Sequence, residues 1–354
     1  MATPPEALAD GLTFTTFKST NTPTLTNDFA RGVYANGSNI YLGTSGGGTF
    51  VSNDSGSTWS NYTASNSGLA SNTAYIPYAV GSTVYIATQS GLGVSTNGGS
   101  TWTNKTMTDG LGASAVFGVY ASGSTVYAAT NGGVSISTDG GGSFTNYTNG
   151  LGSISVNVVY ADGGKIYAAT QGGLAVSSNG GTSFTNITTA NGLLDNKIKD
   201  VFASGNSIYA ATESGLSIST DGGTNWSSYT QANGLGTGGL GSSFVRGLAV
   251  SGGTIYAGTS GGGLSVSTNG GASWTTYTTD DGLGANFLQK MYISDNTLYV
   301  ATSNGGLSIA ALSADPNPVP APLPVLGSAV ALGFCRRLRS HSQRLRHAAG
   351  CGRA

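Results

Sequence analysis

Cationic side chains that recur at one position of a repeated phrase are the first candidates for chemistry in this sequence. The phrase aliphatic-Tyr-x-Ala/Gly-Thr occurs seven times, and the position ten residues before its tyrosine is occupied by Arg31, Tyr75, Phe117, Asn157, Lys199, Arg246 and Gln289. Three cations at one equivalent position predict a shallow ring facing an anion, such as a carboxylated sugar or a phosphate. The candidate ligand-binding residues are Arg31, Tyr75, Asn157, Lys199, Arg246 and Gln289. The competing interpretation is a solvated rim, with Lys199 paired to Asp195.

Carboxylates are the other groups that could do chemistry. A glycosidase needs two of them roughly 5–10 Å apart. The candidates near the same loops are Asp28, Asp109, Asp195, Asp200, Glu213, Asp280 and Asp281. None lies in a recognisable catalytic motif, and Asp280-Asp281 is more typical of a turn. We therefore assign no catalytic residue and keep hydrolysis as an alternative.

The distribution of charge, histidine and cysteine excludes several functions. Eight basic and 15 acidic residues precede position 316, whereas six arginines follow position 335, so the body carries −7 and the tail +6. A body this poor in cations is unsuited to nucleic acid. All four thiol and imidazole groups lie in the tail, at Cys335, His341, His347 and Cys351. We therefore expect no metal site and no cofactor in the body.

The elements that position these residues follow from the spacing of the phrase. Its tyrosines lie 44, 42, 40, 42, 47 and 43 residues apart. Each unit contains four short runs of β-formers separated by Gly-rich turns, so it predicts four strands. Four-stranded units of this length are typical of β-propeller blades. With 58 glycines but no collagen period, and 38% hydrophobic residues, neither a fibre nor a disordered chain fits.

The number of strands predicts an all-β, seven-bladed propeller over residues 12–311, preceded by the segment 1–11. The seventh unit has only three strands before the chain becomes Pro-rich. Its missing fourth strand matches Phe14-Thr15-Thr16-Phe17 at the N-terminus. We expect this N-terminal strand to join the last three and close the ring, which protects the sheet edges.

The turn between the third and fourth strands carries a second motif. It reads Ser52-Asn53-Asp54-Ser55-Gly56-Ser57-Thr58-Trp59 in the first unit and recurs in five more. This resembles the Asp-box of sialidase-like propellers. In that family the acidic or amide position supports the turn, and here it is held by Asp54, Asn97, Asp139, Asn179, Asp221 and Asn269. Sialidase-like catalysis would need three arginines, but the body has only Arg31 and Arg246.

The connectors to the next unit carry a third phrase, as in Asp109-Gly110-Leu111-Gly112 and Asp281-Gly282-Leu283-Gly284. Together with stretches such as Tyr167 to Leu174, it resembles the two-component-regulator type of propeller repeat. That family occurs in bacterial extracytoplasmic sensors, so the resemblance implies an extracytoplasmic, secreted or cell-surface location. No kinase or transmitter domain follows, and residues 1–10 have no signal-peptide pattern.

The C-terminal tail is a different kind of segment. A Pro-rich linker covers residues 312–324, and residues 325–354 contain an apolar run followed by an Arg cluster. The order resembles the PEP-CTERM sorting signal of bacterial surface proteins. It implies an exosortase-type processing enzyme as a partner and membrane contact through the tail only. The alternatives are a disordered basic tail and a terminal amphipathic helix, because the apolar run is shorter than a membrane span.

These observations favour a non-catalytic recognition module that binds a protein or a polysaccharide. One alternative is a carbohydrate-active enzyme of the Asp-box kind. Another is a scaffold or assembly factor for an extracytoplasmic complex. A pocket with two paired carboxylates in the central channel of the propeller would favour the enzyme. A large apolar patch on the outer surface of the propeller would favour the scaffold.

Overall fold

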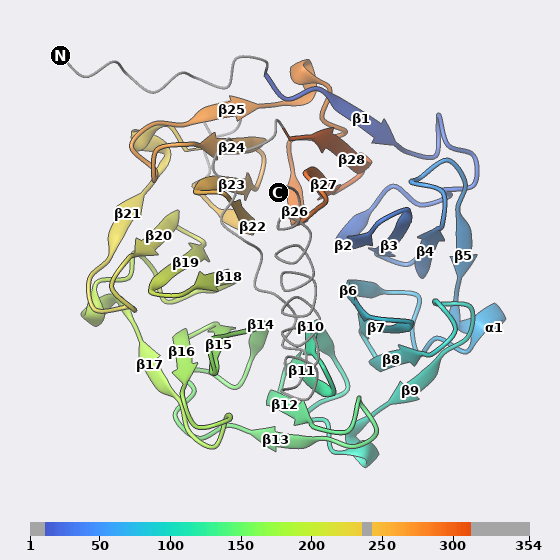
Figure 1. Cartoon of the computed structure of the whole chain (residues 1–354), viewed down its shortest axis with the longest axis horizontal. Helices are drawn as coiled ribbons and strands as arrows, with labels where there is room; N and C mark the ends of the chain where they lie inside the picture. The colour runs from blue at the N-terminus through green and yellow to red at the C-terminus, as the bar shows by residue number, and fades with distance from the viewer. Residues whose placement is uncertain (1–10, 236–242, 313–354) are drawn as a thin grey trace, which may run out of the picture. The chain divides into compact units, whose positions relative to one another are not determined.

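Short runs of Val, Ile, Tyr and Thr between Gly-rich turns form extended backbone in every repeat. The computed structural model describes residues 11–235 and 243–312, and in them 28 strands build seven four-stranded antiparallel sheets. The sheets are blades of a ring, as Figure 1 shows, and the first strand of each blade contacts the first strand of the next all the way round. The predicted seven-bladed β-propeller is confirmed.

The blades are numbered in chain order, from blade 1 (β2–β5) to blade 7 (β26–β28 with β1). The first, innermost strands are β2 (Ala30–Asn36), β6 (Ala74–Val80), β10 (Val116–Ser122), β14 (Val156–Asp162), β18 (Ile198–Ser204), β22 (Val245–Ser251) and β26 (Leu288–Ser294). The second strands are β3 (Asn39–Thr44), β7 (Thr83–Thr88), β11 (Thr125–Thr130), β15 (Lys165–Thr170), β19 (Ser207–Thr212), β23 (Thr254–Thr259) and β27 (Thr297–Thr302).

The outer half of each blade is shorter. The third strands are β4 (Thr49–Ser52), β8 (Gly91–Ser95), β12 (Gly133–Ser137), β16 (Gly173–Ser177), β20 (Leu216–Ser219), β24 (Leu264–Ser267) and β28 (Gly306–Ala311). The fourth strands are β5 (Ser60–Tyr62), β9 (Thr103–Lys105), β13 (Thr145–Tyr147), β17 (Thr185–Ile187), β21 (Ser227–Tyr229), β25 (Thr275–Tyr277) and β1 (Phe14–Phe17). β1 pairs with β28, with Phe14 opposite Ala310, so the N-terminal strand closes the ring as predicted.

One helical turn follows the fourth strand in five blades. These turns are α1 (Ala64–Ser67) and the 3-10 turns η1 (Met107–Asp109), η2 (Thr189–Asn191), η3 (Gln231–Asn233) and η4 (Thr279–Asp281). In η1, Thr106 caps the start and Gly110, at φ 97°, ends the turn in the left-handed conformation. Leu111 is then buried. The Gly-Leu phrase of the connectors therefore ends the turn and anchors the chain before it enters the next blade.

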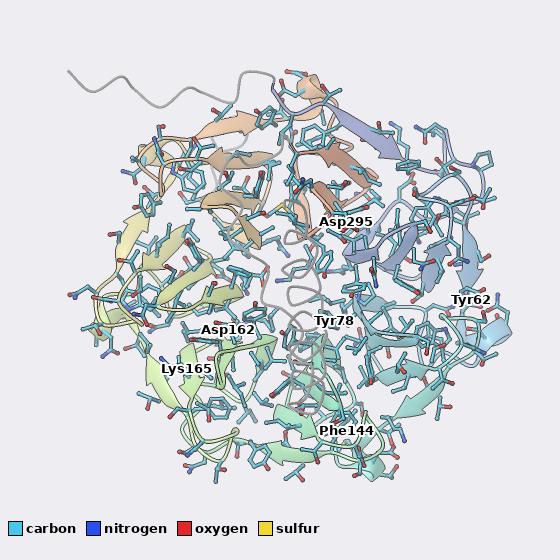
Figure 2. All side chains as sticks on the ribbon, in the orientation of Figure 1. Tyr62, Tyr78, Phe144, Asp162, Lys165 and Asp295 are labelled. Atoms are coloured by element: carbon cyan, nitrogen blue, oxygen red, sulfur yellow. The ribbon has the colours of Figure 1, made fainter. Side chains whose placement is uncertain are left out.

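The hydrophobic core lies between neighbouring blades. The second-strand tyrosines Tyr41, Tyr85 and Tyr167 are buried there, as are the aromatic residues before the fourth strands, such as Trp59 and Phe144. Figure 2 shows Phe144 toward the outer rim of the ring. Because each side chain packs between two blades, the core is divided into seven adjacent clusters rather than one centre.

Six first strands carry an aromatic side chain three residues after the position that lies ten residues before the repeated tyrosine. This aromatic belt consists of Tyr34, Tyr78, Tyr120, Tyr160, Phe202 and Tyr292. Neighbouring ring centroids are 4.7 to 5.4 Å apart from Tyr292 through Tyr34 to Phe202. In blade 6 Ala249 holds the equivalent position, so the series is interrupted there. Figure 2 places Tyr78 beside the centre of the ring.

Candidate functional site

A β-bulge at the start of each first strand positions the candidate binding residues. In blade 3 the pairing of β10 with β11 shifts between Val116 and Gly118, and in blade 7 that of β26 with β27 shifts between Leu288 and Met291. The five other first strands shift at the same place. A bulge leaves one residue out of the ladder and redirects its side chain. In every blade the bulge contains the residue ten positions before the repeated tyrosine, and in blades 2 and 7 the gap in the pairing also contains the residue after it.

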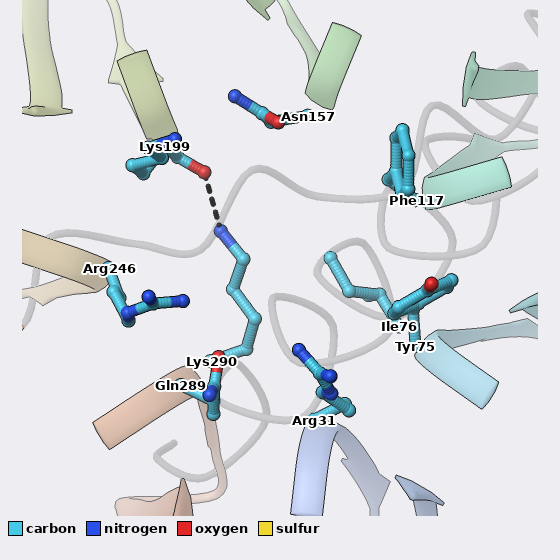
Figure 3. Close-up of a pocket in the computed structure, with 9 residues that line it drawn as sticks. All are labelled: Arg31, Tyr75, Ile76, Phe117, Asn157, Lys199, Arg246, Gln289 and Lys290. Carbon is cyan, nitrogen blue, oxygen red and sulfur yellow. Dashed lines mark hydrogen bonds between the residues drawn. The ribbon is translucent and has the colours of Figure 1, made fainter. Parts of the chain in front are cut away.

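All seven of these residues line one pocket. Its volume is about 270 Å³, and its walls are Arg31, Tyr75, Ile76, Phe117, Asn157, Lys199, Arg246, Gln289 and Lys290 (Figure 3). The structure therefore brings the six candidate ligand-binding residues together with Phe117. It adds Ile76 and Lys290, which the sequence analysis missed. We call this cavity the mouth pocket; that it binds a ligand remains a prediction.

Six of the seven residues that lie ten positions before the repeated tyrosine contact the side chain 14 residues later in the sequence. The residue 14 positions on follows the second strand, which returns antiparallel to the first and brings the pair together. The six pairs are Arg31–Ser45 (3.3 Å), Tyr75–Gln89 (2.8 Å), Asn157–Gln171 (3.2 Å), Lys199–Glu213 (2.8 Å), Arg246–Ser260 (3.3 Å) and Gln289–Ser303 (2.7 Å). These contacts fix the side chains that face the pocket.

Lys199 pairs with Glu213, so the expected pairing with Asp195 is wrong. Glu213 Oε1 lies 2.8 Å from Lys199 Nζ, and Glu213 Oε2 lies 3.0 Å from Lys197 Nζ. Asp195 instead accepts hydrogen bonds from Ser214 Oγ and the Lys197 amide. Burial raises the pKa of Glu213, but the hydrogen bonds from Lys199 and Lys197 outweigh it and hold that pKa below its usual value.

Arg31 and Arg246 have no such partner. No carboxylate in residues 11–235 and 243–312 lies within ion-pair distance of either guanidinium. Arg246 Cζ lies 4.6 Å from the ring centroid of Phe244 and 4.8 Å from that of Phe287. Arg31 Cζ lies 4.9 Å from the centroid of Phe29. Burial, and then repulsion from Arg31, lower the pKa of Arg246. An arginine stays charged despite this, so both remain cations.

Arg31 also has an unsatisfied donor. Its Nε is buried and has no hydrogen-bond partner among the described residues. Its Nη2 donates to Ser45 Oγ at 3.3 Å, a long contact. A buried donor without an acceptor is costly, and this nitrogen is closed to a ligand because it has almost no exposed surface.

Lys290 is the functional candidate that the sequence reasoning missed. Figure 3 shows its side chain crossing the pocket from blade 7 toward blade 5. Its Nζ lies 2.9 Å from Asp200 Oδ2 and donates to the carbonyl of Lys199 at 3.0 Å. Burial lowers the pKa of Lys290, and Asp200 opposes this shift. Lys290 directly follows the residue that lies ten positions before the repeated tyrosine. In blades 1, 3 and 6 the equivalent position is glycine, and Lys290 is the one cation among the seven. This difference is the only feature of the sequence that could have pointed to Lys290.

The six Ser-x-Asp/Asn turns are held by their own polar side chains. In the first, Ser52 Oγ donates to Asp54 Oδ1 at 2.8 Å, and the Thr58 amide donates to the same oxygen at 2.8 Å. The equivalent hydrogen bonds from the serine hydroxyl recur at Asn97, Asp139, Asn179, Asp221 and Asn269. None of the six residues lines the mouth pocket. Their hydrogen bonds stabilise the turn between the third and fourth strands.

The other carboxylates near the loops also hold backbone. Asp109 and Asp281 accept from the amides of Thr106 and Thr278 at the start of their turns, and Asp28 accepts from the Ser19 amide. Within the part of the chain that the structure describes, no cluster of His, Cys, Asp and Glu is arranged to hold a metal ion. No helix in those residues is long and apolar enough to span a bilayer. The linker beyond residue 312 and the tail, with its sorting motif, lie outside them.

Comparisons with solved structures identify the fold. The extracellular domain of the hybrid two-component system BT3049 from B. thetaiotaomicron is 16% identical, with a TM-score of 0.69 over 86% of this chain. This chain covers 42% of that one. YCF48 bound to D1 peptide is 14% identical, with a TM-score of 0.62 over 87% of this chain and 99% of that chain.

Glycoside hydrolases also share the architecture. A GH74 enzyme from Niastella koreensis is 22% identical, with a TM-score of 0.52 over 80% of this chain and 43% of that chain. No protein-family model matches the sequence, and no curated protein matches it. At these identities the likeness is one of fold, and it is common to an extracellular domain of a two-component system, a protein solved with a bound peptide and enzymes.

Proposed function

We propose that this protein is a non-catalytic recognition module whose mouth pocket binds an anionic group of a polysaccharide or protein ligand. One observation carries the proposal: Arg31 and Arg246 line the same pocket without a carboxylate partner among the described residues. Two partly buried, like-charged groups repel each other, and an anion bound beside them would reduce that repulsion.

The charge distribution of the whole body supports this proposal. Four of its eight cations line the mouth pocket: Arg31, Lys199, Arg246 and Lys290. Glu213 and Asp200 compensate two of those charges. The mouth is therefore locally positive on a body with a net charge of −7. A cationic cleft on an otherwise acidic surface steers anions to itself.

The state of the carboxylates favours binding over hydrolysis. Asp200 and Glu213 contact lysines that line the pocket, and both are engaged in ion pairs. A general acid must keep its proton near neutral pH, whereas the pKa of Glu213 is held below its usual value. The enzyme alternative rests on the GH74 likeness alone, which is one of fold.

We also propose an extracytoplasmic location at the cell surface or in the medium. The extracellular domain of a two-component system among the structural neighbours supports it. The Asp-box assignment of the six turns and the PEP-CTERM-like tail belong to the same proposal, with an exosortase-type enzyme as the processing partner. The structure of YCF48 was solved with a bound D1 peptide, and the fold is similar to that of this chain. A protein ligand and an assembly role are therefore part of the proposal.

The test is a binding screen of the full chain against acidic and neutral glycans and peptides, with hydrolysis of the same compounds followed in parallel. We expect binding to acidic ligands without turnover. Arg31→Gln and Arg246→Gln should each abolish binding, because each removes one cation from the pocket. Both variants should still fold, since glutamine occupies the same position in blade 7. Lys165→Gln, which removes a cation from the hairpin at the other end of blade 4, should leave binding intact. Turnover, or binding indifferent to both arginines, would overturn the proposal.

A further inference from the structure

The mouth pocket has two chemically different halves. Lys199, Arg246 and Lys290 form a cationic wall from blades 5, 6 and 7. Tyr75, Ile76 and Phe117, from blades 2 and 3, form an apolar wall, and Figure 3 shows them on the opposite side of the cavity. A small inorganic anion would use the first wall and leave the second in water. A ligand that fills the pocket must present a charge on one side and an apolar face on the other.

The two arginines are held so that their N–H edges remain available. Both guanidinium planes lie near phenylalanine rings, which fixes their orientation by cation–π contact. A guanidinium positioned in this way still presents its fork of N–H donors, and that fork matches a carboxylate. The cationic half is thus prepared for a planar, bidentate anion.

The apolar wall is shaped to contact a ring. The rings of Tyr75 and Phe117 meet edge to face, with centroids 5.5 Å apart. The hydroxyl of Tyr75 already donates to Gln89, and Arg31 Cζ lies over the Tyr75 ring, 5.8 Å from its centroid, so Phe117 offers the larger free ring surface. Among the described residues, the amide oxygen of Asn157 accepts from Gln171 alone, so it retains a lone pair for a ligand hydroxyl. Flat aromatic surface beside such a polar group suits a six-membered ring.

The volume suits one such ring inside the pocket. At about 270 Å³ the pocket is smaller than the roughly 300–1,000 Å³ typical of sites for drug-sized molecules. We infer that the mouth pocket binds a carboxylate borne directly on a six-membered ring, with the carboxylate on Arg31 and Arg246 and the ring against Phe117 and Tyr75. This inference rests on the proposed anion recognition and names its ligand class. The ring belongs either to a hexuronate unit of an acidic polysaccharide or to an aromatic acid.

The experiment is an NMR titration of the full chain with five probes: acetate, inorganic phosphate, benzoate, glucuronate and methyl glucoside. We expect at least one ring acid to bind about tenfold or more tightly than acetate, phosphate and the uncharged sugar. The tighter of the two ring acids identifies the source of the ring. Phe117→Asn, which copies the residue of blade 4, should bring the ring acids to within about threefold of acetate. Arg246→Gln should weaken all four anions.

The possible results distinguish the ring-carboxylate ligand from the more general anion recognition. Equal binding of acetate and both ring acids, tighter binding of phosphate, or a ring preference that survives Phe117→Asn would overturn the ring carboxylate and leave anion recognition standing. Binding of methyl glucoside as tight as that of glucuronate would also overturn it, because the carboxylate would not be the anchor. Failure of every anion to bind the unmodified protein would overturn the proposed anion recognition itself.

Discussion

Lys290 Nζ lies 2.9 Å from Asp200 Oδ2, although blade 6 stands between the strands that carry them. The same carboxylate oxygen accepts the Leu248 amide of blade 6 at 2.9 Å, so one atom ties three consecutive blades together. Both side chains are largely buried, with 17% and 10% of their surface exposed. This contact links the floor of the mouth pocket to the stability of the ring.

Removing Lys290 should therefore destabilise the protein. Lys290→Met leaves the Asp200 carboxylate buried without its cation, which costs about 3 kcal/mol. The measurement is urea-induced unfolding followed by circular dichroism. Lys197→Met, which breaks a solvent-exposed ion pair with Glu213, is the matched control and should barely move the midpoint. Equal effects of the two variants would mean that the cross-blade contact has no special role.

Gly247 should be essential for the same contact. A side chain here would overlap the carbonyl oxygen of Gln289 and lie 3.2 Å from Lys290 Cα. We expect Gly247→Ala to cost about 2–3 kcal/mol through overpacking. The equivalent Gly118 has more room, since a Cβ there would lie 3.2 Å from Asn157 O. Gly118→Ala should cost less than about 1 kcal/mol in the same unfolding experiment. A reversed order would contradict the packing argument.

Stability should fall in acid through the turn aspartates. The hydrogen bonds from Thr58 lower the pKa of Asp54 to about 2, and those from Asn225 lower that of Asp221 to about 2. Hydrogen bonds led by that from Ser137 also lower the pKa of Asp139. An unfolded aspartate titrates near 3.9, so the stabilisation is complete above about pH 4 and is lost as the pH falls toward 2.

The check is the melting temperature between pH 5 and pH 2 for the unmodified protein and for the triple variant Asp54→Asn/Asp139→Asn/Asp221→Asn. Asparagine already holds the other three turns, so the variant should fold. Its melting temperature should depend less on pH. Parallel curves would show that these carboxylates are not the groups responsible.

Alkaline unfolding should be coupled to the aromatic belt. Burial raises the pKa values of its five tyrosines: Tyr34, Tyr78, Tyr120, Tyr160 and Tyr292. An unfolded tyrosine ionises near pH 10, so the stabilisation is present below about pH 10 and is lost as the pH rises further. Absorbance at 295 nm and circular dichroism should then change together in the last titration step. Ionisation of all 17 tyrosines while the dichroism is unchanged would contradict the belt's burial.

Much of the fold and of the pocket could be predicted from the sequence because the repeat is regular. Each copy of the tyrosine phrase marks the second strand of a blade, so a fixed count back from it reaches the same depth in every first strand. Arg31, Lys199 and Arg246 could be assigned to one ring for this reason. The match between residues 14–17 and the other fourth strands was enough to predict closure, since every blade needs a fourth strand.

The partners of individual charges could not be predicted in this way. Lys199 has acidic residues within reach on both sides in the sequence, and the antiparallel register selects Glu213 rather than Asp195. A position count that ignores this register cannot choose between them. The tyrosines of the aromatic belt recur at a fixed position of the repeat, so the sequence shows them as a series. Their mutual contacts depend on the closed ring, because it brings strands about 40 residues apart side by side.

The sequence by itself determined the seven blades, their strand order and the seven residues at the mouth, because a repeated local pattern gives each unit the same strand register. Only the tertiary structure decided that Lys290 crosses blade 6 to Asp200, that Arg31 and Arg246 have no carboxylate partner in the described residues, and that Phe117 faces them. Those relations join residues of different blades. They depend on the curvature of the ring and on which side chains are small enough to let others pass, and no single repeat contains that information.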